Sequence, residues 1–346
     1  MIKFGFNMNN QIQIHATNVE GLGAKNVVKS LITSIDEEYP NKIEHVYLNS
    51  KDYNVTSLKI KNYKRFLPKS LSRLFEIIFS RLFFKNKKTL VLGDIPLTGI
   101  KNQTLFVHQA NLISPKVNEF SSKEIKFRIS RFLFNINLKY VNRIIVQSDF
   151  MKEELESSYE ALPKKIDVIP LPNTFKLEIN KSKKSLKKLV LFYPALNYKH
   201  KNHDFLFEIA KSKISKDFEI YVTLEEKEFE KYQSLKFVKN LGVISHHEVL
   251  EFYKKTDILL NLSNLESFCL PLVEAIYLNI PVLTIDRTYT KWMCEDFGYY
   301  FTDKESFFSS LNEIKEAIKN QKLKPIAKAK KKFKHNWEKV AGMFLE

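Results

Sequence analysis

The stretch DILLNLSNLESFCLPLVEAIYLNIPVLTID, residues 257–286, decides the fold. The apolar run 257–262 predicts a buried strand, the polar residues after it predict a loop, and the apolar run 280–285 predicts a second buried strand. Pro271 suits the first turn of a helix, where its missing N–H would be unpaired in any case. Asn279 suits the left-handed end of that helix. The stretch therefore predicts a strand, a loop, a helix and a strand.

The predicted start of this helix is suited to bind an anion. Glu266 lies in the preceding loop and Glu274 lies one turn inside the helix. Free N–H groups and the helix dipole favour negative charge at such a terminus, whereas carboxylates accept hydrogen bonds from hydroxyls. The pattern indicates a ligand that combines a diphosphate with hydroxyl-rich rings. An ordinary strand–helix–strand unit with two solvated glutamates is the alternative.

Residues 266–275, ESFCLPLVEA, resemble the Glu-x7-Glu signature of family-4 glycosyltransferases, retaining enzymes of the GT-B fold that use nucleotide sugars. The family motif is roughly E-G-F-G-L-P-x-x-E-A, so both glycines are replaced here. The resemblance implies an α/β protein with two Rossmann-like, doubly wound domains facing a central cleft. It implies that Glu274 accepts from ribose hydroxyls and that Glu266 orients the donor sugar. The backbone expected near the donor phosphates belongs to Ser267, Phe268, Cys269 and Leu270.

A lysine-bearing loop opens the second half of the chain. The predicted strand 188–193 is followed by the loop PALNYKHKN and a predicted helix over 203–213. The family has G-R-x-x-x-x-K here, and its arginine and lysine clamp the diphosphate. Lys201 matches the lysine, but the arginine is absent, so Lys199 is the candidate second cation, with a point charge instead of a fork. Surface lysines of a basic protein are the alternative, more serious for Lys199 than for Lys201.

Residues 245–248, SHHE, form a capping box that predicts a helix over 246–254. The preceding strand, predicted over 236–241, ends at Gly242. This Gly-x-x-Ser-x-x-Glu pattern resembles the family's loop that contacts the nucleotide base through its backbone. His200 and His203 have no carboxylate or cysteine partner in the sequence pattern, and no Asp-x-Asp pair is present. We therefore expect no metal site, no cofactor, and metal-independent transfer.

The N-terminal half begins with a predicted strand over 2–6, a predicted helix over 24–34 and a strand over 44–48. Between the first two lies a loop with Gly21 and Gly23. A glycine-containing loop that opens a helix lets the backbone approach a ligand closely, and in the resembling family such a loop lies near the donor phosphates and the acceptor. A plain tight turn is the alternative.

Polar residues follow two further predicted strands, 90–93 and 105–107. The second strand ends at His108, and Asp94 follows the first. Doubly wound sheets place their ligands at the carboxyl ends of parallel strands. Related enzymes carry a histidine at such a position that points at the donor sugar and the acceptor. His108 and Glu266 are therefore the catalytic candidates, and a histidine that caps a strand end is the alternative.

The positive charge of the chain is concentrated in one region. The net charge is +17, and residues 59–143 hold 18 lysines and arginines against 4 acidic residues. Such a region attracts a polyanionic surface. Apolar residues fall at helical spacing within 64–88, and 123–143 repeats the pattern, which is typical of a core helix or of an interfacial helix. Because no nucleic-acid recognition motif accompanies the charge, we expect an anionic membrane surface and a lipid-linked acceptor, and no nucleic acid.

The length of 346 residues suits two domains. We predict an acceptor-binding domain over 1–172, a linker over 173–187, a nucleotide-sugar-binding domain over 188–325, and a closing helix over 326–346 that packs back on the first domain. No apolar run approaches the ~20 residues of a membrane span, and the N-terminus lacks the design of a signal peptide. With only two cysteines in the chain, we expect a cytoplasmic protein, peripheral at the inner face of the membrane.

The predicted function is metal-independent transfer of a sugar, with retention, from a UDP- or GDP-linked donor to a lipid-linked glycan. The resemblance suggests bacterial surface-polysaccharide assembly, such as that of lipopolysaccharide. A nucleotide-sugar epimerase or hydrolase of the same fold is one alternative. A non-catalytic GT-B subunit that docks on a membrane or a partner enzyme is the other.

Overall fold

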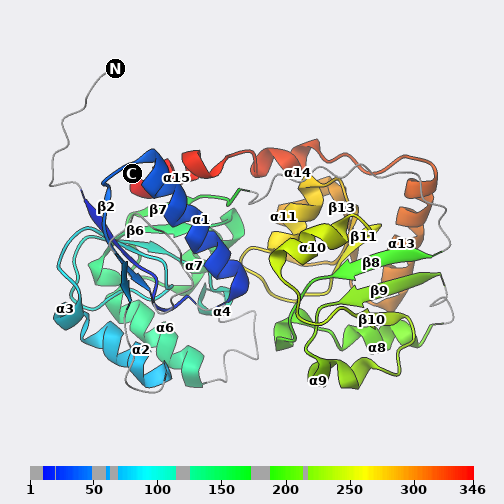
Figure 1. The fold of residues 1–346 in the computed structure, drawn as a ribbon, viewed down its shortest axis with the longest axis horizontal. Coiled ribbons are helices and arrows are strands. Elements are labelled where there is room, and N and C mark those ends of the chain that lie inside the picture. Colours follow the sequence, from blue (N-terminus) through cyan, green and yellow to red (C-terminus); the bar gives the residue numbers. More distant parts are fainter. Residues whose placement is uncertain are drawn as a thin grey trace. The chain divides into compact units, whose positions relative to one another are not determined.

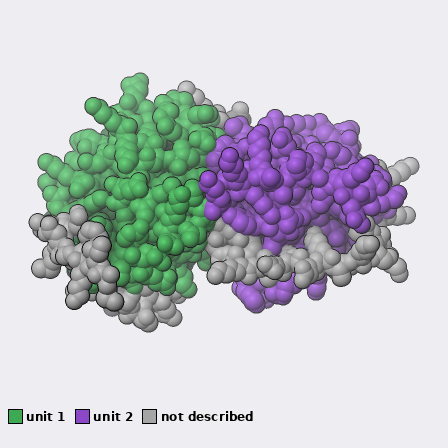
Figure 2. All heavy atoms as spheres, turned by 90° about the horizontal axis from the view of Figure 1, so that it is seen from above, with its two compact units in different colours: residues 1–174, 335–346 green, residues 175–334 purple. Residues whose placement is uncertain are grey.

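The structure is a computed structural model that describes residues 11–19, 21–48, 60–62, 69–113, 125–172, 188–212 and 217–346. It divides into two compact units, coloured separately in Figure 2. Unit 1 comprises residues 1–174 and 335–346, and unit 2 comprises residues 175–334. The predicted first strand over 2–6 and the whole predicted linker over 173–187 lie outside the described residues.

Unit 1 is built on a parallel sheet of seven strands in the order β3-β2-β1-β4-β5-β6-β7 (Figure 1). The order reverses at β1, as in doubly wound folds. The loops that follow β1 and β4 therefore lie at the carboxyl ends of the strands, where such sheets bind ligands. The strands are β1 (Ile12–His15), β2 (Ile43–Leu48), β3 (Ile60–Asn62), β4 (Thr89–Val91), β5 (Gln103–Phe106), β6 (Val141–Val146) and β7 (Lys165–Val168). The helices are α1 (Leu22–Glu38), α2 (Lys69–Ile78), α3 (Ser80–Phe83), α4 (Ala110–Ile113), α6 (Ile125–Asn137), α7 (Asp149–Ser158) and α15 (Trp337–Leu345).

Strand β1 occupies residues that were predicted to lie in the loop between a strand over 2–6 and a helix over 24–34. All four of its side chains are buried. Central parallel strands normally consist of continuous apolar residues, and Gln13 and His15 interrupt that pattern. The structure satisfies Gln13 internally, because its Nε2 donates to the carbonyl of Lys85 at 2.6 Å and to Thr89 Oγ1 at 2.7 Å. The polar strand is stable only through partners that are distant in sequence.

The C-terminal tail forms two helices instead of the single predicted helix. α14 (Ala327–Lys332) belongs to unit 2, and α15 belongs to unit 1. Asn336 starts a new helix because its side chain accepts a hydrogen bond from Lys339 N at 3.0 Å, as an N-cap does. α15 packs against α1, and a Cβ at Gly342 would lie 2.6 Å from the hydroxyl of Tyr39.

Unit 2 contains a parallel sheet of six strands in the order β10-β9-β8-β11-β12-β13. Its order reverses at β8, so the loops after β8 and β11 lie where a doubly wound sheet binds its ligand. The strands are β8 (Leu189–Tyr193), β9 (Phe218–Val222), β10 (Val238–Asn240), β11 (Ile258–Asn261), β12 (Val282–Ile285) and β13 (Gly298–Phe301). The α-helices are α8 (Phe205–Ala210), α9 (Glu226–Phe229), α10 (His246–Tyr253), α11 (Leu270–Tyr277), α12 (Thr288–Cys294), α13 (Lys304–Lys319) and α14.

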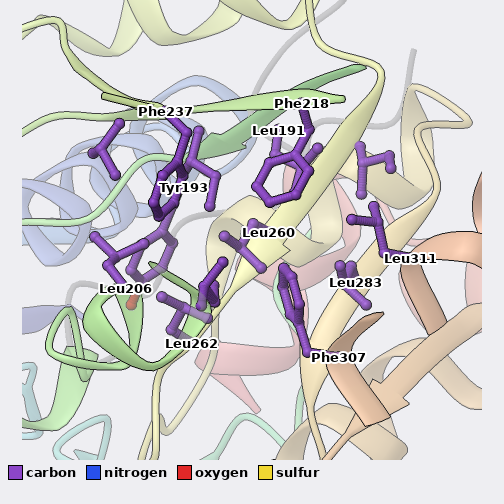
Figure 3. Close-up of a cluster of buried hydrophobic side chains, with 14 of the residues drawn as sticks. Leu191, Tyr193, Leu206, Phe218, Phe237, Leu260, Leu262, Leu283, Phe307 and Leu311 are labelled. Atoms are coloured by element: carbon purple, nitrogen blue, oxygen red, sulfur yellow. The ribbon is translucent and has the colours of Figure 1, made fainter. Parts of the chain in front are cut away.

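A dense apolar core holds β8 and β11 in place. Figure 3 shows Leu191 and Leu260, one from each strand, beside Leu283 of β12 and Phe307 of α13. These four side chains are at most 1% exposed, and burial of each contributes about 1.5–3 kcal/mol. The core therefore fixes the two strands whose carboxyl ends carry the loops described next.

Candidate functional site

Two loops meet at the carboxyl ends of β8 and β11. The amide of Asn264 donates to the carbonyl of His200 at 2.7 Å, and Ser263 Oγ donates to the same carbonyl at 3.2 Å. The hydroxyl of Tyr193, the last residue of β8, donates to the carbonyl of Lys201 at 2.6 Å. The first two hydrogen bonds join the lysine-bearing loop to the loop that carries Glu266, and the third holds the lysine-bearing loop against β8.

Lys201 and Glu266 form an ion pair across this junction. Their side chains are 20% and 13% exposed, so the pair is accessible at one side. Burial alone would lower the pKa of Lys201, but the adjacent Glu266 carboxylate raises it above its ordinary value. Lys201 is thus a permanent cation. Lys199 lies at the start of the same short helical turn, η3 (Lys199–Lys201), with an exposed side chain.

Helix α11 begins beside this pair without a side-chain cap. Its N-cap is Cys269, which makes no side-chain capping bond, and Pro271 lies in its first turn. Phe268 and Cys269 are buried; the ring of Phe268 packs against Phe333 at 5.8 Å, and burial raises the pKa of the Cys269 thiol to about 12. These two side chains therefore support the loop. At Ser267, Phe268, Cys269 and Leu270 the backbone is the part suited to meet an anion.

Glu274 lies one turn inside α11 and is only 4% exposed. Its two carboxylate oxygens accept hydrogen bonds from Tyr253 Oη at 2.7 Å and from His246 Nε2 at 2.8 Å. The hydrogen bond to Glu274 raises the pKa of His246. Tyr253 is completely buried, whereas the His246 side chain is 36% exposed. His246 is therefore the partner that a ligand hydroxyl could displace.

Gly242 joins β10 to the start of α10 and has φ +73°, a left-handed conformation that glycine adopts without strain. The predicted capping box is present at the start of α10. The side chain of Ser245 accepts from the Glu248 amide, and the Glu248 carboxylate accepts from Ser245 N at 2.7 Å. Together they fix where His246 begins the helix.

In unit 1, His108 and Asp94 meet at the carboxyl ends of the neighbouring strands β4 and β5. Asp94, at φ +67°, accepts hydrogen bonds from the amides of His108 at 2.6 Å and Gln109 at 2.9 Å. Its second oxygen lies 3.3 Å from His108 Nε2. Burial raises the pKa of Asp94. The imidazole is 19% exposed and stacks on Phe106, so it is oriented on one side and accessible on another, as proton transfer requires.

A buried polar cluster at the end of β1 was not predicted from the sequence. His15 Nε2 lies 2.6 Å from Glu76 Oε1 and 3.1 Å from the hydroxyl of Thr17, which also donates to Glu76. Glu76 comes from α2 and is completely buried. The available signal was its position between Phe75 and Ile77, as the single acidic residue of α2. The cluster links α2 to the carboxyl end of β1, a central strand of the sheet.

The two glycines predicted to open a ligand loop lie at the start of α1. Gly21 is the N-cap, with φ −62° and ψ 141°, and no atom lies within 4 Å of a Cβ placed there. Gly23 is exposed in the first turn, because α1 begins at Leu22, earlier than predicted. The backbone of Gly21 does not require glycine, but the space beside it is open. In the part of the chain that the structure describes, no group of three His, Cys, Asp or Glu residues could hold a metal.

Comparisons with known proteins find a matching family and several similar folds. Residues 174–338 match the family "Glycosyl transferases group 1". No curated protein sequence matches the chain. Among solved structures, WaaG, a glycosyltransferase involved in lipopolysaccharide biosynthesis, has 12% identity and a TM-score of 0.71, covering 96% of this chain and 99% of WaaG. Sucrose-phosphate synthase from Thermosynechococcus elongatus has 11% identity and a TM-score of 0.70, covering 96% and 97%.

A third similar structure contains a nucleotide sugar. HepE from Anabaena, in complex with UDP-glucose, has 16% identity and a TM-score of 0.62, covering 97% of this chain and 95% of HepE. At these identities the structures establish the fold, and the family match establishes the kind of domain. Residues 174–338 are therefore a group 1 glycosyltransferase domain, and the chain as a whole has the GT-B fold.

Proposed function

We propose that the protein transfers a sugar, with retention and without a metal, from a nucleotide-sugar donor to a lipid-linked glycan. A nucleotide-sugar donor is supported by the Lys201–Glu266 pair beside the uncapped start of α11. Glu274 lies one turn inside this helix. A cation, free amides and two carboxylates match a diphosphate flanked by two hydroxyl-rich rings. The UDP-glucose bound to HepE supports a UDP-linked donor.

Each group has a role in this proposal. The amides at the start of α11 and the Lys201 ammonium bind the diphosphate. Glu266 accepts from hydroxyls of the donor sugar, and Glu274 accepts from the ribose. Negative charge grows on the leaving diphosphate as its bond to the sugar breaks. Donors that are already oriented toward this charge lower the barrier without reorganising.

The acceptor half of the proposal rests on unit 1. His108, oriented by Asp94, is suited to interact with the acceptor hydroxyl. Gly21 leaves open space near the end of β1. We assign the acceptor site to these loops. The involvement of WaaG in lipopolysaccharide biosynthesis supports a surface glycan as the product.

A lipid-linked acceptor would explain the unusual surface of α2, α3 and α6. The apolar residues expected on a core or interfacial helix are exposed: Leu71 is 53% exposed, Leu82 74% and, on α6, Phe132 64%. Exposed apolar stripes beside basic residues are typical of helices that lie in a membrane interface. α3 and the end of α6 are both tied to Thr98, through Ser80 at 3.2 Å and Asn137 at 3.0 Å. No helix among the described residues is long and apolar enough to cross a membrane.

Thermal unfolding with UDP-, GDP-, ADP- and CMP-linked sugars, in the presence of a chelator, tests the donor half. We expect one nucleotide to raise the melting temperature, because a ligand that binds only the folded state stabilises it. With the preferred nucleotide sugar, the sugar should then be transferred and the nucleoside diphosphate released only when a glycan acceptor is added. Product formation without an acceptor would favour an epimerase or a hydrolase instead.

The second candidate function is a non-catalytic subunit that docks on a membrane or a partner. The observation that favours it is the replacement of both family glycines, by Ser267 and Cys269, beside the start of α11. It predicts no thermal shift with any nucleotide sugar. That outcome would overturn the transferase proposal.

A further inference from the structure

The proposed donor site has less positive charge than a diphosphate requires. Lys201 pairs with Glu266 in the loop before α11, so its charge is neutralised within the site. Lys199, the candidate second cation, is exposed to solvent at the first position of η3. A diphosphate linked to a nucleoside and a sugar carries about two negative charges, and planar guanidinium groups bind such oxygens most effectively.

Arg287 brings a guanidinium to this loop cluster from another strand. It follows β12, which pairs with β11. Its Nη2 donates to Asn264 Oδ1 at 2.7 Å, and its Nη1 donates to the carbonyl of Asp286 at 2.8 Å. Asn264 is also the residue whose amide holds the His200 carbonyl at 2.7 Å, directly before Lys201. One residue therefore links Arg287 to both loops of the site.

The charge of Arg287 is not neutralised by its surroundings. Among the described residues no carboxylate forms an ion pair with it, and the adjacent Asp286 pairs with Lys291 at 2.9 Å instead. Both partners of Arg287 are neutral oxygens, and they occupy two of its five N–H donors. The side chain is half-buried. It is held in place and partly desolvated, with donors left for an anion.

We propose that Arg287 binds the donor diphosphate and supplies, from the end of β12, the guanidinium that the loop after β8 lacks. This inference rests on the proposed function, because it assumes a nucleotide diphosphate at the start of α11. Asn264 would hold the fork in position while the remaining N–H groups bind phosphate oxygens. The alternative role is structural: Arg287 would only orient Asn264 and its loop.

Binding of a nucleoside, its monophosphate and its diphosphate separates the two roles. The nucleotides used carry the base whose nucleotide sugar gives the largest thermal shift. Calorimetry measures their affinity for wild type, Arg287→Gln, Arg287→Lys and Lys291→Gln. Lys291→Gln is the matched control, because it removes one positive charge from the same region through a residue that is 61% exposed and paired with Asp286. We expect Arg287→Gln to weaken the diphosphate about 10- to 100-fold, as loss of a charged hydrogen bond does. The affinity of Arg287→Gln for the nucleoside should stay within about twofold of wild type. The affinity of Lys291→Gln for the diphosphate should do the same.

Arg287→Lys retains the charge without the fork and should fall between wild type and Arg287→Gln. If Arg287→Gln fails to fold, Arg287→Lys is the variant that is compared with wild type. Equal losses for nucleoside and diphosphate would show that Arg287 only orients the loop. Equal losses in Arg287→Gln and Lys291→Gln would show a general charge effect. Wild-type protein that binds no nucleotide would overturn the proposed function itself, which is distinguishable from both.

Discussion

Glu274 is a buried carboxylate with two hydrogen-bond donors already in place. If it accepts from the ribose, Glu274→Gln should weaken nucleotide binding by about 1.5–3 kcal/mol, since the ribose loses an ionised acceptor. Calorimetry measures the change. Glu251→Gln is the control, because Glu251 is exposed on α10 and pairs with Lys254. Equal affinity of Glu274→Gln and wild type would remove Glu274 from the donor site.

His108 should affect turnover instead of donor affinity. We expect His108→Ala to lower the transfer rate about 100-fold, the smaller end of what a positioned acid or base contributes, with nucleotide affinity unchanged. Asp94→Asn retains an acceptor for the two amides but loses the charge beside the ring, so a smaller loss is expected. His247→Ala, an exposed histidine in unit 2, controls for the assay. Normal turnover in His108→Ala would contradict its catalytic role.

From the sequence, candidate site residues were indicated by local motifs and by the ends of predicted strands. Glu266, Glu274 and Lys201 lie in such motifs, and the structure brings Lys201 and Glu266 together across 65 residues. Arg287 lies in no motif, because its relation to the donor loop depends on strand order. His15 and Glu76 were missed for the same reason, since 61 residues separate them.

The contact between α10 and α11 should make donor binding dependent on pH. Glu274 raises the pKa of His246 above its ordinary value of 6.5. A raised pKa means that the His246–Glu274 pair stabilises the fold fully below the unfolded-state pKa. This contribution is lost as pH rises through the folded-state pKa. Tyr253 also faces Glu274, and His247 and Glu248 flank the imidazole along α10.

A ribose hydroxyl that uses Glu274 must compete with protonated His246. Nucleotide-sugar affinity should therefore rise as pH increases from about 6 to about 9, across the raised pKa. His246→Ala should bind more tightly at the acidic end and lose this dependence, whereas His247→Ala should retain it. Calorimetry with a nucleotide sugar is suitable because its diphosphate does not titrate in this range. A parallel pH profile for His246→Ala would contradict the competition.

Helices and strands were predictable where short-range rules govern them. The capping box of α10 is present as predicted. Asn279, just after α11, has φ +55°, the left-handed conformation expected at a helix end. β1 was not predictable, because its polar side chains are satisfied by β4 and by α2. The closing helix was predicted as one segment because both halves are amphipathic, and the cap at Asn336 divides it.

The architecture of the whole molecule followed from repetition. Strands and helices alternate through both halves of the chain, and this rhythm predicts parallel doubly wound sheets. Both sheets are parallel and reverse at their first strand. The surface could not be predicted in this way. The periodicity of the residues around Leu71 and Leu82 fits a core helix as well as an interfacial one, and only the three-dimensional structure shows that these side chains are exposed.

If this surface contacts a membrane, removing its most exposed apolar side chains should release the protein from anionic vesicles. Leu82→Ser with Phe132→Ser changes one residue on α3 and one on α6, which are 74% and 64% exposed. Burial of such side chains contributes about 1.5–3 kcal/mol each, so vesicle affinity should fall at least ~10-fold. Cosedimentation with phosphatidylglycerol vesicles measures the change.

Val243→Ser with Leu323→Ser is the matched control, because both residues are exposed and apolar but belong to unit 2. This variant should bind as wild type does. High salt should also weaken wild-type binding, because the basic residues act through screened charges. Release by salt alone, with no effect of Leu82→Ser and Phe132→Ser, would mean that the protein is held by charge and that the apolar stripes face another partner.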